Sequence, residues 1–146
     1  MINMDDPRMA VAILTVRVIA GILFFFQGYD KVFNVGIGQV RQTMNSSMAG
    51  RNIPEFLVTF TAGFSSYVEL IGGFLLIIGF FKFFAAYFLC FSLVLVSIGF
   101  SIIKPMWDSF HLVFRLALLI FILITPPEWD IISFDHLFRM SGLLSP

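Results

Sequence analysis

Apolar residues fill four long stretches of the chain, and charged residues mark where these stretches begin and end. The stretches cover approximately residues 9–33, 56–81, 83–103 and 107–125. Each is close to the roughly 20 residues that an α-helix needs to cross a hydrocarbon layer about 30 Å thick. Transmembrane β-strands would instead show segments of about ten residues with alternating polarity. The pattern therefore predicts an all-α polytopic membrane protein, a four-transmembrane-helix antiparallel bundle that forms one domain over residues 1–146.

The connections between the stretches differ in length and polarity. The first is polar, but Val40, Met44 and Met48 recur in it every four residues, so a short interfacial helix and an irregular loop both fit. The second is only "GFFKFF", which indicates a tight antiparallel helical hairpin. The tail "EWDIISFDHLF" mixes aromatic and acidic residues, as expected of a segment that lies along lipid headgroups.

Composition supports a membrane protein and excludes several other classes. Hydrophobic residues make up 59% of the chain and charged residues 12%, against roughly a quarter charged in soluble domains. The net charge is zero and the basic residues are scattered, so no nucleic-acid partner is expected. The leader "MINMDDPRM" carries two Asp residues, which argues against a cleaved signal peptide. No zinc spacing, phosphate loop or nucleophile motif appears, so we expect no metal site and assign no catalytic residue.

Three charged residues fall well inside the apolar stretches: Arg17, Glu69 and Arg115. A charge at the centre of a membrane helix costs about 2.5–3.5 kcal/mol on insertion scales, so such residues usually face the bundle interior and a partner. At about 1.5 Å per residue, Glu69 can be level with Arg115 and within side-chain reach of Arg17. His111 lies one turn from Arg115, near the expected level of Tyr29, Asp30 and Lys31.

Helical periodicity supports an inward face for these charges. Two stripes recur at three- and four-residue steps: Arg17, Gly21, Phe24, Gly28 and Lys31, and Ala62, Ser66, Glu69, Gly73 and Leu76. Small residues on such stripes let membrane helices approach closely. The sequence therefore predicts one buried polar cluster that three helices share.

This cluster has three possible roles. The charges can simply neutralise one another and orient the bundle. Two guanidinium groups against one carboxylate leave a positive surplus that suits an anionic or carbonyl-bearing ligand, such as a quinone or an acidic headgroup. A proton relay through Glu69 and His111 is the third possibility.

The same residues form a pattern that resembles the DoxX family of small four-helix bacterial membrane proteins. The first stretch carries Arg17, Gly21, Gly28 and Lys31 at the spacing R-x(3)-G-x(6)-G-x-x-K. Further similar positions are Pro54, Glu69, Gly72, Gly73 and Gly79, together with Ser133 to Asp135 near the end. The resemblance covers nearly the whole chain. The segment "TPPEWD" departs from it, as do His111 and Arg115, which stand on a helix expected to be less charged in relatives.

The resemblance implies a multi-pass protein of the bacterial inner membrane with cytoplasmic termini. Family members, and a related subunit of thiosulfate:quinone oxidoreductase, are linked to quinone-coupled or oxidative-stress complexes beside a catalytic partner. We therefore expect an accessory or quinone-contacting subunit that is not catalytic alone, with no covalent cofactor, in contact with lipid and with other membrane subunits. The alternatives are a structural or assembly subunit and a small-molecule or proton transporter. A transporter is less expected, because the sequence shows no inverted repeat.

Overall fold

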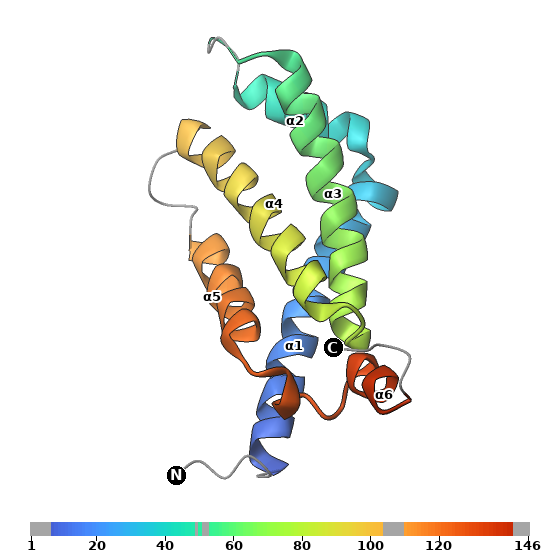
Figure 1. Cartoon of the computed structure of the whole chain (residues 1–146). Helices are drawn as coiled ribbons and strands as arrows, with labels where there is room; N and C mark the ends of the chain where they lie inside the picture. Colours follow the sequence, from blue (N-terminus) through green and yellow to red (C-terminus); the bar gives the residue numbers. More distant parts are fainter. Residues whose placement is uncertain (1–6, 49, 51–52, 104–109, 142–146) are drawn as a thin grey trace.

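The computed structural model describes residues 7–48, 50, 53–103 and 110–141, and within these it is helical apart from short connections (Figure 1). Four longer helices form the bundle: α1 (Pro7–Tyr29), α3 (Glu55–Ile78), α4 (Lys82–Ile103) and α5 (Phe110–Ile124). A π-helix, η1 (Asp30–Val35), and the short α2 (Ile37–Ser47) connect α1 to α3. The chain then continues from α5 through a 3-10 turn, η2 (Pro127–Trp129), into α6 (Phe134–Met140).

The all-α prediction is confirmed, and the number of membrane spans is close to the prediction. Among the described residues, three segments are long and apolar enough to cross a membrane: Pro7–Val35, Glu55–Ile78 and Lys82–Gly99. α5 has 15 residues and is apolar but shorter. The start of the fourth predicted stretch, residues 107–109, lies outside the described residues. For the connection after the first stretch, the sequence was compatible with either a short helix or an irregular loop. The structure shows a helix there, α2.

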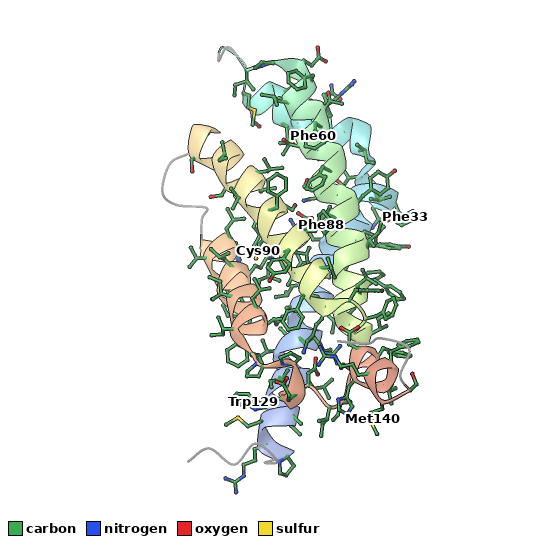
Figure 2. All side chains as sticks on the ribbon, in the orientation of Figure 1. Phe33, Phe60, Phe88, Cys90, Trp129 and Met140 are labelled. Carbon is green, nitrogen blue, oxygen red and sulfur yellow. The ribbon has the colours of Figure 1, made fainter. Side chains whose placement is uncertain are left out.

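The outer surface of the bundle is rich in large apolar side chains. Phe33, Phe60 and Phe88 are 63%, 53% and 55% exposed and project from different helices (Figure 2). In water so many exposed aromatic rings would be unfavourable, whereas lipid solvates them. The bundle therefore presents the surface that a bilayer requires.

α1 and α3 pack with their backbones in contact through glycines. A Cβ atom added to Gly21 would lie 2.9 Å from the carbonyl oxygen of Gly73, and one added to Gly73 would lie 2.8 Å from the carbonyl oxygen of Gly21. Such spacing leaves no room for a larger residue. Both predicted inward stripes are buried, except that Lys31 belongs to η1 and is partly exposed.

The apolar core joins the four longer helices. It includes Ala20 and Phe24 of α1, Leu76 of α3, Leu89 of α4 and Leu119 of α5. Phe24 and Leu119 are each fully buried. This core fixes the distances between the helices that carry the intramembrane charges.

The C-terminal segment folds back onto the α3–α4 turn. α3 ends where Gly79 adopts a left-handed conformation (φ 71°), three residues before the end of the predicted stretch, because glycine accepts positive φ without strain. Asp135 then accepts hydrogen bonds from the N–H groups of Phe81 (2.8 Å) and Lys82 (3.1 Å). Asp135 thus satisfies free donors at the N-terminus of α4, a capping role that is supplied from a distant part of the chain.

Candidate functional site

Arg17 lies at the end of the bundle where α6 packs, and it is 1% exposed. Its Nη1 atom donates to the carbonyl oxygens of Leu76 (2.7 Å) and Ile77 (3.1 Å), at the end of α3. Its Nη2 atom donates to the carbonyl oxygen of Ile132 (2.7 Å), in the C-terminal segment. One guanidinium group therefore connects α1, α3 and the C-terminal segment.

Asp130 supplies the negative charge for this end of the bundle. Its Oδ2 atom lies 2.8 Å from Lys82 Nζ and 3.4 Å from Arg17 Nε, and all three side chains are almost fully buried. We call Arg17, Lys82 and Asp130 the basal cluster. Gly79 makes room for it, since a Cβ atom there would lie 2.7 Å from Arg17 Cζ and 2.8 Å from Ser133 Cβ.

The predicted single cluster is therefore wrong, because Arg17 does not reach Glu69. Side chains on an α-helix lean toward its N-terminus, so Arg17 extends toward the basal end while Glu69, on the antiparallel α3, leans the other way. Leu76, which accepts from Arg17, is two turns beyond Glu69, or about 10 Å along the helix axis. The intramembrane charges form two clusters instead of one.

The second cluster lies in the middle of the bundle. Lys31 Nζ and Glu69 Oε2 are 2.6 Å apart, with Glu69 almost fully buried and Lys31 partly exposed. Arg115 Nη1 donates to the side-chain oxygen of Gln27, and its Cζ lies 5.7 Å from the centre of the Phe24 ring. We call Gln27, Lys31, Glu69 and Arg115 the central cluster.

A cavity of about 340 Å³ adjoins the central cluster between α4 and α5. Its polar lining residues are Gln27, Glu69, His111 and Arg115, and its apolar ones are Leu93, Val96 and Leu112. Hydrogen-bond donors, one carboxylate and apolar side chains thus share a space that is large enough for a small aromatic headgroup.

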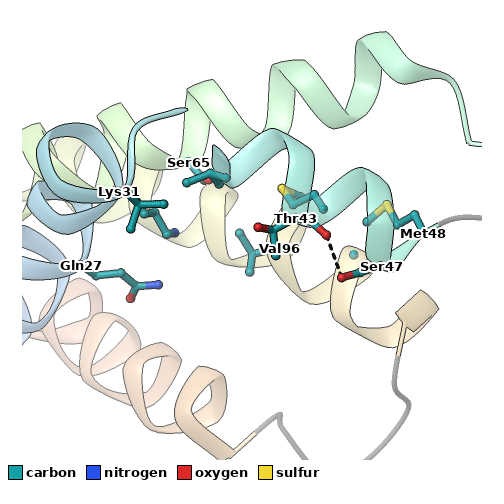
Figure 3. Close-up of a pocket in the computed structure, with 11 residues that line it drawn as sticks. Gln27, Lys31, Thr43, Ser47, Met48, Ser65 and Val96 are labelled. Atoms are coloured by element: carbon teal, nitrogen blue, oxygen red, sulfur yellow. Dashed lines mark hydrogen bonds between the residues drawn. The ribbon is translucent and has the colours of Figure 1, made fainter. Parts of the chain in front are cut away.

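A second cavity, of about 320 Å³, lies beneath α2 (Figure 3). Gln27 and Lys31 lie at one end of it, and Ser47 and Met48 lie at the other. It shares Gln27 and Val96 with the cavity between α4 and α5, so the two cavities adjoin. We call them the α2 cavity and the central cavity.

The structure brings together some of the predicted site residues and separates others. Glu69, Arg115 and His111 line the central cavity, and Lys31 joins them through its ion pair. Tyr29 and Asp30 are exposed: the Tyr29 ring lies 4.9 Å from that of Phe33, and Asp30 accepts a hydrogen bond from Asn34 (2.9 Å). These two residues lie outside the candidate site.

Sequence reasoning missed three residues of the clusters: Gln27, Lys82 and Asp130. Gln27 precedes Lys31 by four residues and therefore shares its helix face, a signal that was present in "FFFQGYDK". Lys82 and Asp130 are 48 residues apart, and no local pattern connects them. Lys82 and Asp130 come into contact because the C-terminal segment folds back onto the α3–α4 turn.

The helices, the lipid-compatible surface and the two buried charge clusters define a polytopic α-helical membrane protein. The sequence pattern of the DoxX family matches residues 12–101, which is more than half of the chain. The chain therefore belongs to the DoxX family. A comparison with curated proteins and one with solved structures gave no match. Arg115 and Asp130 lie beyond the matched residues.

Proposed function

We propose that this chain is an accessory subunit of a bacterial inner-membrane oxidoreductase complex and that its central cavity contacts a quinone headgroup. The observation that carries the proposal is the partner of Arg115. This guanidinium group binds the neutral amide of Gln27, while the nearby carboxylate of Glu69 is paired with Lys31. One positive charge of the central cluster is thus left for a ligand.

The donors and the walls of the cavity suit a quinone. Arg115 presents several N–H groups in a planar array and Gln27 carries an amide NH₂, so both can donate to carbonyl oxygens. Leu93, Val96 and Leu112 provide apolar surface for the faces of a ring. When bound, a quinone would supply the electron-accepting chemistry, and this chain would hold and orient its headgroup while a partner subunit catalyses the reaction.

Arg17 has no direct part in this proposal. Its donors already bind three backbone carbonyl groups at the basal end, away from the central cavity. In this proposal the ligand role that the charge surplus suggested belongs to Arg115, since Lys31 is paired with Glu69, and Arg17 takes the orienting role.

The test is purification from the native host in mild detergent, followed by extraction of quinone and identification of co-purifying proteins. Arg115→Gln should lower quinone content or affinity by about 10- to 100-fold, which corresponds to the roughly 1.5–3 kcal/mol of a hydrogen bond to a charged group. Gln27→Leu removes a neutral donor and should lower it by about 2- to 10-fold, which corresponds to roughly 0.5–1.5 kcal/mol. Arg41→Gln removes the same charge from an exposed position on α2 and is the matched control.

Other outcomes would reject the proposal. If Arg115→Gln and Gln27→Leu are abundant and retain quinone like the parent protein, the central cavity is not a quinone site. Co-purification with partner subunits but without quinone would favour a structural or assembly subunit. Proton or solute uptake by proteoliposomes without a partner would instead favour a transporter.

A further inference from the structure

The lining of the α2 cavity is mostly apolar, but polar side chains occur at both of its ends and between them. Thr43 and Ser47, on α2, are exposed, whereas Ser65, on α3, is 3% exposed and lines the cavity from the opposite wall. Gln27 and Lys31 form the far end (Figure 3). A series of polar side chains thus leads along the cavity from the amphipathic helix α2 toward the interior of the bundle.

The Lys31–Glu69 pair lies where this series of side chains meets the core. The Lys31 side chain is 20% exposed and lines the α2 cavity, whereas Glu69 is 2% exposed and lines the central cavity. The two charged atoms are 2.6 Å apart, so the pair spans the boundary between the two cavities.

Two physical arguments favour water in the α2 cavity. An ion pair withdrawn fully from water carries a desolvation penalty of several kcal/mol per ion, which hydration from one side reduces. The backbone between α1 and α2 is also irregular, because the π-helix η1 ends at Gly36, whose φ is 82°. Irregular backbone at membrane depth is tolerated where it is buried in protein or lines a water-filled cavity; η1 has no buried residue, and its Val35 lines this cavity.

We infer that the α2 cavity is a water-filled vestibule that connects the aqueous phase on the α2 side of the membrane with the Lys31–Glu69 pair. Because Gln27 and Val96 belong to both cavities, the vestibule continues to the central cavity and brings water and protons close to Arg115. This inference goes beyond the proposed function and does not depend on the identity of a bound ligand. The competing occupant is a lipid chain, which Val40, Met44 and Met48 would contact.

Cysteine labelling separates water from lipid, because a thiol reacts as its thiolate, which forms in water and not in hydrocarbon. Single cysteines are placed in a Cys90→Ala background and treated in sealed vesicles with a charged, membrane-impermeant methanethiosulfonate. Val96→Cys, in the vestibule, should react about tenfold faster or more than Val94→Cys. Val94 is 53% exposed on the bundle surface, so exposure alone predicts the opposite order.

Ser65→Cys and Ser66→Cys form a second matched pair. Both serines are buried on α3, but only Ser65 lines the α2 cavity. Ser65→Cys should be labelled from the α2 side alone, and Ser66→Cys should stay unmodified. Serine-to-cysteine changes are small, so this pair remains informative if a valine variant fails to fold. Thr43→Cys, at the exposed end, shows that the reagent reaches the cavity.

A plug at the exposed end provides a further check. Thr43→Trp should slow labelling of the cysteine at position 96, whereas Gln42→Trp, exposed on α2 beside the cavity, should not. If Thr43→Cys reacts while Val96→Cys reacts no faster than Val94→Cys and Ser65→Cys is inert, the cavity holds lipid and the inference is wrong. Quinone content is measured separately, so loss of the proposed function would leave this result unaffected.

Discussion

Replacement of Asp130 by Asn should destabilise the bundle more than any neutralisation of an exposed charge. Asp130 Oδ2 lies 2.8 Å from Lys82 Nζ and 3.4 Å from Arg17 Nε. At an effective dielectric constant of about 20, these separations correspond to gross attractions of roughly 6 and 5 kcal/mol. Desolvation offsets much of this attraction, but the variant would leave Lys82 without its ion-pair partner and Arg17 with only the weaker attraction of Asp135. Removal of one partner of a buried ion pair costs about 3–5 kcal/mol, which is the expected loss of stability.

Equilibrium unfolding in mixed micelles of a mild detergent and dodecyl sulfate measures this loss. Asp30→Asn is the control, because Asp30 is exposed and should change the free energy of unfolding by no more than about 0.5 kcal/mol. The double variant Asp130→Asn/Lys82→Met removes one cation together with the anion. It should therefore recover part of the stability, with a coupling of about 0.5–3 kcal/mol.

Two results would refute the account of the basal cluster. A cost for Asp130→Asn below about 1 kcal/mol, close to the control, would mean that Arg17 and Lys82 do not depend on this carboxylate. Strict additivity of the two changes in the double variant would mean that Lys82 and Asp130 are not coupled. Neither result would bear on the three backbone carbonyl groups that Arg17 binds, so its orienting role rests on those bonds.

Three other perturbations test the packing, the α4 cap and the topology. Gly73→Val should lower stability by about 1–3 kcal/mol or prevent folding, because its side chain would meet the α1 backbone, whereas Gly63→Val on the same helix, with open space around it, should be tolerated. Asp135→Ala should cost about 0.5–2 kcal/mol in the same unfolding assay through loss of two hydrogen bonds at the start of α4, and the exposed Glu128→Ala should not. Reporter fusions to the two ends should both be cytoplasmic; ends on opposite sides would remove one span, and two periplasmic ends would reverse the orientation.

The helices and their inward faces could be predicted from the sequence because both depend on local periodicity. Glycine and serine at three- and four-residue steps mark the faces on which α1 and α3 touch, and Gly21 and Gly73 are indeed in backbone contact. The predicted stretch extends to Phe81, three residues beyond the observed end of α3 at Ile78. Apolar content continues through "GFF", and only the left-handed conformation of Gly79 ends the helix.

The pairing of the charges was harder to predict than their burial. Helix rise gives the depth of a Cα atom, but a long side chain displaces its charge by a turn or more toward the helix N-terminus. The register of α1 against α3 also separates this pair: Glu69 packs beside Gly28, about three helical turns from Arg17, and the side chains of Arg17 and Glu69 then lean further apart. The side chain of Lys31 likewise extends toward the N-terminus of its helix and reaches Glu69, and the side chain of Arg115 reaches Gln27. Asp130 could not be assigned at all, because its contact depends on the path of a connection with no periodic pattern.

Both charge clusters are completed by residues that follow the segment shared with the DoxX family. Residues 12–101 supply Arg17 and Lys82 at the basal end and Gln27, Lys31 and Glu69 in the centre. The C-terminal third adds Asp130, which pairs with both basal cations, and Arg115, which gives the central cluster its surplus charge. Within residues 12–101 alone, the central cluster has no net charge, because Lys31 forms an ion pair with Glu69. Any preference of the central cavity for a ligand with carbonyl or anionic oxygens therefore depends on α5, and relatives that lack a cation at the position of Arg115 should not share it.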